Sequence, residues 1–380
     1  MENLQLDQER QKQAKIYARI RRRLSLLDMG LSGLYALLWA FSGWSGSLRN
    51  VLGSLTSSPW LLVPLFAAVF GGIINLLTLP LNYYSGFVLP HRFGMSNQTL
   101  KGWISDQVKG LLIGILLGLL LLELVYALLR WQPDTWWLWV AAVLLVFNVL
   151  LSNLAPVIFM PLFNKFIPLG EEYAELAERL LRLAEKTGTR VRGVYTFDMS
   201  RRTRAANAAL AGLGNTRRII LGDTLIREFS TDEIETVMAH ELGHQVHKDI
   251  PLGIVVETAV TLVGLFLAYL GLRWGVAIFG YQGPADPAAM PLLVVVMGLY
   301  GLVTMPLGNG FSRWREHRAD EYALRLTHNG PAFASALTRL ANQNLAEVDP
   351  EPWVEWLFYS HPALGKRILM AQTHVEGQER

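Results

Sequence analysis

Six apolar stretches, each long enough to cross a lipid bilayer, constrain this chain more than any other feature of its sequence. A membrane-spanning helix needs about 20 apolar residues to cross a hydrocarbon core about 30 Å thick. The stretches lie near residues 26–46, 60–84, 107–130, 135–160, 250–275 and 290–310. Charged residues make up only 17% of the chain, below the share of about a quarter in an average soluble domain. We therefore expect a mainly α-helical protein that crosses the membrane about six times.

The loops between these stretches differ in their content of Lys and Arg. Residues 1–25 are rich in basic side chains, whereas residues 276–289 contain no Lys or Arg and residues 47–59 contain only Arg49. Because basic loops stay on the cytoplasmic side, both termini and residues 161–249 should be cytoplasmic, and the protein should lie in the cell membrane. A cleaved secretory signal is the alternative for the N-terminus. The leader is too long and too acidic for one, so we favour a retained first span.

This topology divides the chain into five parts. They are a basic cytoplasmic N-terminal helix (1–25), four spans (26–160), a soluble segment (161–249), two spans (250–310) and cytosolic helices (311–380). The formal net charge of +3 is too small and too scattered to indicate nucleic-acid binding. The chain contains no cysteine, so any metal site must be built from His, Asp or Glu.

The soluble segment has the pattern of a small α+β unit. Residues 171–188 have apolar side chains at helical spacing, and residues 191–197 and 217–223 are typical of short strands. Ser230 and Glu233 form the sequence pattern of a capping box, which predicts a helix running from there to about Lys248.

That last helix carries the sequence HELGH. His240 and His244 are four residues apart and therefore project from one face of a helix, where both can bind a single metal ion. Glu241 lies at the edge of that face, where it can act as a general base on a water molecule. H-E-x-x-H is the zinc-protease arrangement, with one zinc ion per chain. The alternative is an ordinary polar surface helix.

A catalytic zinc ion normally has three protein ligands and an open fourth position. The candidate third ligand is Glu316, just after the sixth span, and Asp320 lies four residues further along the same predicted helix. Asp320 can accept the free ring N–H of a zinc-binding histidine. The alternative is a solvated charge cluster, because Arg313, Arg315 and Arg318 lie in the same stretch.

Carboxylates in the middle of two apolar stretches carry further information. Glu123 and Glu257 lie within predicted spans, and a carboxylate facing lipid is costly. Either each one makes a local hydrogen bond between packed helices, or the spans enclose a water-filled cavity that these side chains face.

The chain resembles the type I CAAX prenyl proteases, which are integral-membrane zinc metallopeptidases. The resemblance rests on HELGH, REHRAD (315–320), PLFNKF (161–166), SHPALGKRI (360–368) and the stretches 79–110 and 200–226, in the family's order. It covers about residues 15–370. It implies a ring of membrane helices around a large water-filled chamber, with a zincin-like α+β protease domain closing the chamber on the cytosolic side.

The resemblance also implies roles for individual residues. His240, His244 and Glu316 would bind zinc, and Glu241 would be the general base. Asp320 would lie outside the ligand set, next to a zinc-binding histidine, with a role in proton donation. His361 and Arg367 match a C-terminal motif near the site, where His361 would stabilise the oxyanion and Arg367 would orient acidic groups. Asn207 and Ala208 match an edge strand that binds the substrate backbone.

Some features depart from the eukaryotic members of that family. We count six spans rather than seven, and Ala209 and Leu210 stand where those proteins have aromatic residues. These departures indicate a prokaryotic member. We expect an endopeptidase for membrane-associated or C-terminal, CAAX-like peptides, with or without a lipid modification. The alternatives are a heat-shock protease for membrane quality control and a non-enzymatic metal transporter or sensor.

Overall fold

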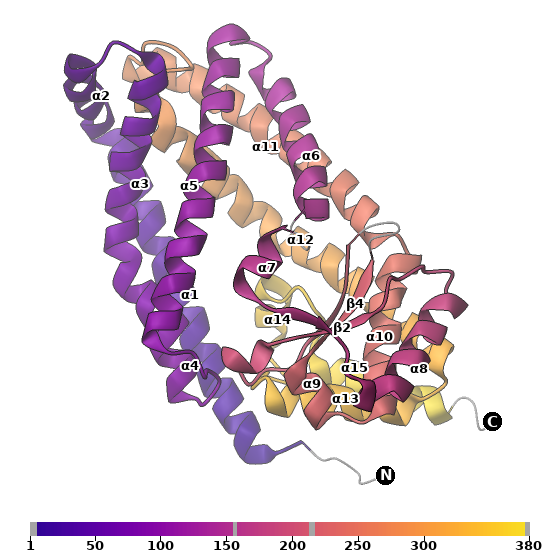
Figure 1. Ribbon diagram of the computed structural model, residues 1–380. Coiled ribbons are helices and arrows are strands. Elements are labelled where there is room, and N and C mark those ends of the chain that lie inside the picture. The colour runs from indigo at the N-terminus through magenta and orange to yellow at the C-terminus, as the bar shows by residue number, and fades with distance from the viewer. Residues whose placement is uncertain (1–5, 155–157, 213–216, 377–380) are drawn as a thin grey trace.

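The computed structural model describes residues 6–154, 158–212 and 217–376. Most of these residues are helical, and the long helices stand side by side above a small globular part that contains the sheet (Figure 1). The long helices are α1 (Gln8–Phe41), α3 (Pro59–Tyr83), α5 (Leu100–Trp131), α6 (Trp136–Leu154), α11 (Asp249–Phe279) and α12 (Met290–Thr327).

The remaining elements are short. The helices are α2 (Trp44–Leu55), α4 (Leu89–Arg92), α7 (Met160–Phe163), α8 (Ala174–Lys186), α9 (Asp223–Glu228), α10 (Thr231–Val246), α13 (Gly330–Gln343), α14 (Pro352–Phe358) and α15 (Leu364–Glu376). The strands are β1 (Phe166–Pro168), β2 (Val194–Phe197), β3 (Ala208–Ala211) and β4 (Arg218–Gly222).

Within the described residues, six helices are long and apolar enough to cross a membrane, which confirms the number predicted from the sequence. Large apolar side chains remain exposed on them, as Leu116 (71% exposed) and Val303 (70%) illustrate. Such a surface is unfavourable in water and suits a hydrocarbon environment.

Two of these helices continue from a predicted span into a segment that was predicted to be cytoplasmic. Residues 8–41 contain no proline, and the basic N-terminal segment and the first span form one continuous helix, α1. The sixth span continues through α12 as far as Thr327, so Glu316 and Asp320 lie on the same helix as that span. The predicted fourth span ends as α6 at Leu154, and residues 155–157 of the prediction lie outside the described residues.

The sheet of the described residues has the strand order β1-β2-β4-β3. The two inner strands, β2 and β4, are parallel and correspond to the two strands predicted from sequence. The outer strands, β1 and β3, pair antiparallel with them. β1 was not predicted, whereas β3 lies at the edge strand that the family resemblance implied for Asn207 and Ala208. The β3 strand lies at one edge of the sheet, and its register pairs Ala208 with Leu221. Residues 213–216, which belong to the sequence stretch 200–226, lie outside the described residues.

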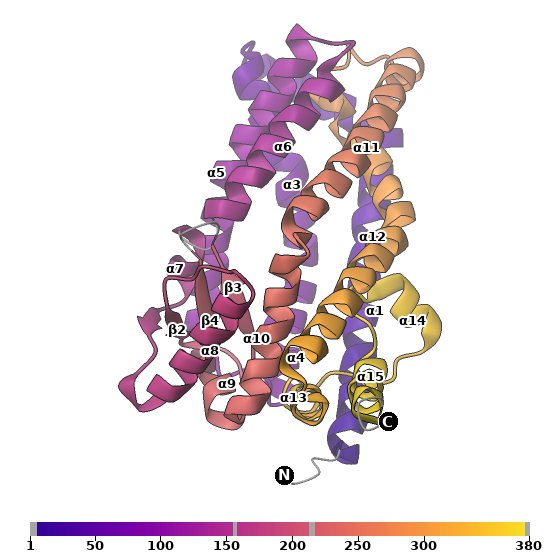
Figure 2. The same ribbon diagram turned by 90° about the vertical axis from the view of Figure 1, so that its right-hand side faces the viewer.

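The globular part has its own hydrophobic core between the sheet and helices α8, α10, α13 and α15 (Figure 2). Leu180 of α8, Leu221 of β4, Met238 of α10 and Phe333 of α13 are almost fully buried in it. Because α10 packs into this core on one side and against α12 on the other, its position is set by both the soluble part and the membrane helices.

The opposite end of the bundle is closed by α2 and the turn that precedes α12 (Figure 1). An ion pair between Arg49 of α2 and Asp286 of that turn joins these two segments. The Asp286 carboxylate also accepts hydrogen bonds from the backbone N–H groups of Gln282 and Ala288. The two loops expected outside the cell therefore lie together, at the end of the molecule away from the sheet.

Candidate metal centre

The α10 helix presents the two histidines as its sequence predicts. The predicted capping box is present: Ser230 accepts the N–H of Glu233, and the Glu233 carboxylate accepts the N–H of Ser230. Gly243 lies between the histidines on the side that faces α12. A Cβ atom at this position would lie 3.1 Å from Cα of Ala319. The missing side chain lets the two helices approach closely enough for α12 to bring Glu316 to the histidine face.

Three side chains converge on one point. Nε2 of His240 lies 3.2 Å from Nε2 of His244 and 3.3 Å from Oε2 of Glu316, and Nε2 of His244 lies 3.4 Å from Oε1 of Glu316. Ligands about 2.0–2.2 Å from a tetrahedral zinc ion lie about 3.3–3.5 Å from one another. Oε2 of Glu316 is buried and makes no hydrogen bond within the described residues. The three residues therefore fit a zinc ion in both ligand type and spacing.

A second set of carboxylates orients the two imidazole rings. Oδ1 of Asp320 lies 2.8 Å from Nδ1 of His240, and Oδ2 of Asp249 lies 2.7 Å from Nδ1 of His244. An ionised carboxylate only accepts, so the Nδ1 atoms carry the hydrogens and each neutral ring keeps an Nε2 lone pair directed at the common point. Asp320 in turn accepts two hydrogen bonds from Arg367, at 2.7 and 2.6 Å.

Sequence reasoning missed Asp249. Its side chain is 3% exposed and it begins α11, immediately after Lys248, which has a positive φ of 55°. A carboxylate five residues after the second histidine, at the start of an apolar stretch, was the available signal. Nothing in the local periodicity shows that the helix breaks there and points this carboxylate at His244.

The surroundings of the site raise the pKa values of both His240 and Glu241. Burial alone lowers the pKa of His240, but the carboxylates of Asp320 and Glu316 outweigh it and raise the pKa to about 9. For Glu241, burial raises the pKa, and the charges of His240 and His244 offset only part of that shift. A carboxyl group with a raised pKa is better suited to exchange a proton near neutral pH.

The structure also brings the C-terminal motif to this point. Nε2 of His361 lies 3.3 Å from Oε1 of Glu316, and its side chain is 60% exposed. Oγ of Ser360 lies 3.0 Å from Nδ1 of the same ring. The preceding residue, Tyr359, is fixed by a hydrogen bond of 2.6 Å from Arg313 of α12 to its carbonyl oxygen.

Asn207 and Ala208 lie where β3 begins, on the edge strand that runs beside α10. The carbonyl oxygen of Asn207 accepts the N–H of Gly222 at 2.9 Å, which ties the start of the strand to β4. Within the described sheet, β3 pairs only with β4, so its other edge offers backbone groups to an added strand.

A helix that carries HELGH, a carboxylate from a second helix at metal-ligand spacing and a bundle of apolar helices long enough to span a membrane together define a membrane-embedded metalloprotease. Residues 2–165 match the family model described as CAAX prenyl protease N-terminal, five membrane helices. Residues 171–375 match the model of peptidase family M48. The chain therefore belongs to peptidase family M48.

Relatives from bacteria and yeasts resemble nearly the whole chain. It is 30% identical over 370 residues to the uncharacterized metalloprotease YhfN of Bacillus subtilis, covering 96% of this chain and 86% of that protein. It is 30% identical over 323 residues to CAAX prenyl protease 1 of Saccharomyces cerevisiae, covering 80% and 70%. The crystal structure of S. mikatae Ste24p matches with a TM-score of 0.84 at 26% identity, covering 96% of this chain and 90% of that one. The bacterial relative is consistent with the prediction that this chain is a prokaryotic member of the family.

Proposed function

We propose that this protein is a zinc-dependent endopeptidase that hydrolyses membrane-associated or C-terminal peptides at the cytoplasmic face of the membrane. The observation that carries the proposal is the convergence of His240, His244 and Glu316 at zinc-ligand spacing, beside a half-buried Glu241. In that position, the chemistry that zinc supplies is Lewis acidity toward a carbonyl oxygen and a water molecule.

The chain's own residues supply the proton transfers. Glu241 takes a proton from the attacking water and returns it to the amine that leaves when the C–N bond breaks. A neutral His361 whose Nδ1 accepts from Ser360 carries its hydrogen on Nε2, beside Glu316, from where it can donate to the oxyanion that develops on the carbonyl. Asp320 and Arg367 act on His240, with Asp320 orienting the ring and able to take part in proton donation.

The substrate would bind in an extended conformation beside β3. An added strand would use the unpaired edge that starts at Asn207 and Ala208, with main-chain hydrogen bonds holding the peptide next to α10. Related proteins are named CAAX prenyl proteases, which supports C-terminal peptides, with or without a lipid group, as the substrate class.

The first experiment compares peptide cleavage by the purified, zinc-loaded protein. Matched prenylated and unprenylated C-terminal peptides are incubated with it, and the products are mapped by mass spectrometry. We expect internal cleavage near the C-terminus. Cleavage restricted to unfolded membrane proteins would instead favour a quality-control protease, the second candidate function. The match of residues 2–165 to the CAAX prenyl protease N-terminal model supports the first.

Two variants separate the proposed roles of the glutamates. Glu241→Gln should keep close to one zinc ion per chain and lose about 10²–10⁴-fold in rate, because it removes the base and no ligand. Glu316→Ala should purify with much less zinc. Metal analysis beside the cleavage assay measures both, and near-normal cleavage by Glu241→Gln would overturn the proposed mechanism.

A further inference from the structure

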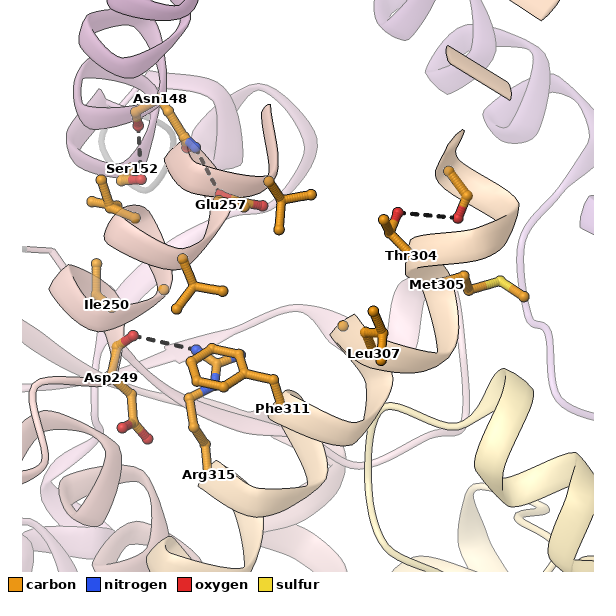
Figure 3. A pocket seen from close by; sticks show the side chains of 16 residues that line it. Asn148, Ser152, Asp249, Ile250, Glu257, Thr304, Met305, Leu307, Phe311 and Arg315 are labelled. Carbon is orange, nitrogen blue, oxygen red and sulfur yellow. Dashed lines mark hydrogen bonds between the residues drawn. The ribbon is translucent and has the colours of Figure 1, made fainter. Parts of the chain in front are cut away.

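A cavity of about 520 Å³ lies between α6, α11 and α12, on the membrane side of the metal centre. Figure 3 shows Asn148 and Ser152 on one wall, Thr304 and Met305 on the other, and Glu257 directed into the space between them. Apolar side chains from α11 and α12 form most of its remaining walls, with Asp249 and Arg315 at one end.

Glu257 is the residue of this cavity that most needs a partner. Oε2 of Glu257 accepts one hydrogen bond, of 2.8 Å, from Nδ2 of Asn148. A carboxylate offers about four acceptor positions. No Lys, Arg or His forms an ion pair with it in the part of the chain that the structure describes. Glu257 is exposed in the structure, so its remaining acceptor positions are open to water or to a ligand. A charged group inside a membrane-spanning segment is costly unless water or a partner compensates it, which makes this carboxylate a candidate binding group.

Among the described residues, Arg315 is the one cation that lines the cavity, and its guanidinium already has other partners. Nη1 of Arg315 donates to the carbonyl oxygen of Asp249 at 3.2 Å, and its guanidinium lies 4.9 Å from the ring centre of Phe311. Figure 3 shows Arg315 at the Asp249 end of the cavity and Glu257 at the Asn148 end. Glu257 therefore presents a negative charge at one end of the cavity, away from Asp249 and Arg315 at the other end.

The same cavity adjoins the metal centre. Asp249, which lines it, binds the ring of His244. Glu257 lies eight residues further along α11, a rise of about 12 Å at about 1.5 Å per residue. An extended peptide advances about 3.3 Å per residue, so this distance corresponds to about four residues of substrate.

We propose that the cavity is a specificity subsite in which Glu257 binds a basic side chain of the peptide substrate, within about four residues of the cleaved bond. The apolar walls suit the aliphatic stem of lysine or arginine, and the carboxylate suits the charged end. The proposal rests on the proposed peptidase function and makes Glu257 the residue that determines a preference for basic peptides.

The test uses one cleaved peptide and its variants. Each position within four residues of the cleaved bond is changed in turn to Lys, Gln or Glu, and kcat/KM is measured with the zinc-loaded wild type. At one position, Lys should exceed Gln by about tenfold or more, because Gln leaves Glu257 without its cation. Glu257→Gln should remove this preference, and Glu257→Lys should reverse it in favour of Glu.

Glu123→Gln is the matched control. Glu123 is another carboxylate of the spans, it lies 3.7 Å from Arg130 and it does not line this cavity. This variant should keep the preference for Lys. Equal preferences in wild type and Glu257→Gln would overturn the proposal, as would a wild-type preference for Glu that Arg315 would explain.

Binding separates this inference from the peptidase proposal. The same peptides are titrated into Glu241→Gln and into the double variant Glu241→Gln, Glu257→Gln, with fluorescence anisotropy as the readout. Lys peptides should bind about tenfold or more tightly to the first protein and lose that advantage in the second. If this binding result is obtained and the wild type cleaves no peptide, the subsite proposal is retained and the peptidase proposal is rejected. Cleavage without any charge preference would do the reverse.

Discussion

At the scale of single residues, the metal centre depends on side chains that do not touch the metal position. His240 is held by Asp320, Asp320 is held by Arg367, and His244 is held by Asp249. These contacts set the rotation of each ring and the nitrogen that carries the hydrogen, and therefore decide whether the two Nε2 lone pairs coincide.

Asp249 offers a direct test of this arrangement. Asp249→Ala should lower zinc affinity by about 10–100-fold, because the His244 ring loses the acceptor that fixes its orientation. Competition with a chelator measures the affinity. Asp134→Ala, which removes an exposed carboxylate from the turn between α5 and α6, should leave it unchanged. An unaltered affinity in Asp249→Ala would show that His244 is oriented by other groups.

The pKa of His240 predicts how metal binding depends on pH. In the metal-free protein, this pKa is raised from its ordinary value of 6.5 to about 9. The protonated ring therefore stabilises the folded metal-free protein below pH 6.5, and this stabilisation is lost as the pH rises through about 9. Zinc must displace that proton. Zinc affinity should therefore rise by about tenfold per pH unit up to about pH 9. Chelator competition at several pH values checks this, and a flat profile would contradict it.

At the scale of elements, the site is made by the packing of α10 against α12. Neither helix alone can bind zinc with three ligands, because the histidines lie on one and Glu316 on the other. Their close contact requires Gly243, where an added Cβ would lie 3.1 Å from Cα and 3.2 Å from the carbonyl oxygen of Ala319. Backbone atoms cannot move aside as a flexible side chain can.

Gly243→Ala should therefore separate the two helices and destabilise the protein by about 1–3 kcal/mol. Zinc affinity should fall as well, although no ligand has been changed. Gly298→Ala is the control, since a Cβ at that position on α12 meets nothing within 4 Å and alanine favours the helix. Thermal unfolding and zinc titration of both variants measure the difference. Wild-type zinc affinity in Gly243→Ala would show that the helix separation does not matter.

At the scale of the whole molecule, the fold places the sheet and metal centre at one end of the bundle and α2 at the other (Figure 1). The ion pair between Arg49 and Asp286 joins two segments that carry few basic residues. Both should face the outside of the cell.

Reporter fusions test this orientation. A reporter inserted after residue 54 or residue 282 should signal from the outside, and one at the C-terminus should signal from the cytoplasm. We expect this result because the segments near the metal centre are rich in Lys and Arg, which stay on the cytoplasmic side. A cytoplasmic signal from residue 54 or residue 282 would rule out the proposed topology.

Access of water to the cavity can be measured separately, because the chain contains no cysteine. Thr304→Cys, on the cavity wall, should react with a small water-soluble thiol reagent. Ala268→Cys, on α11 but fully buried between helices, should remain unlabelled in the folded protein. Equal protection of both cysteines would mean that the cavity is closed to water.

The features that the sequence alone determined are those encoded within a short window. Apolar length specifies the spans, the Ser230–Glu233 pair specifies the start of α10, and the spacing of His240 and His244 places them on one helix face. Each depends on residues within a few turns of one another, whose geometry the helix itself dictates.

Only the tertiary structure decided which distant groups meet. Arg367 reaches Asp320 across 47 residues, and Asn148 reaches Glu257 across 109. Strands β1 and β3 are three and four residues long and exist because β2 and β4 provide their partners. Asp249 meets His244 because the helix breaks at Lys248, between α10 and α11. Such contacts are set by packing between elements, which leaves no periodic signal along the chain.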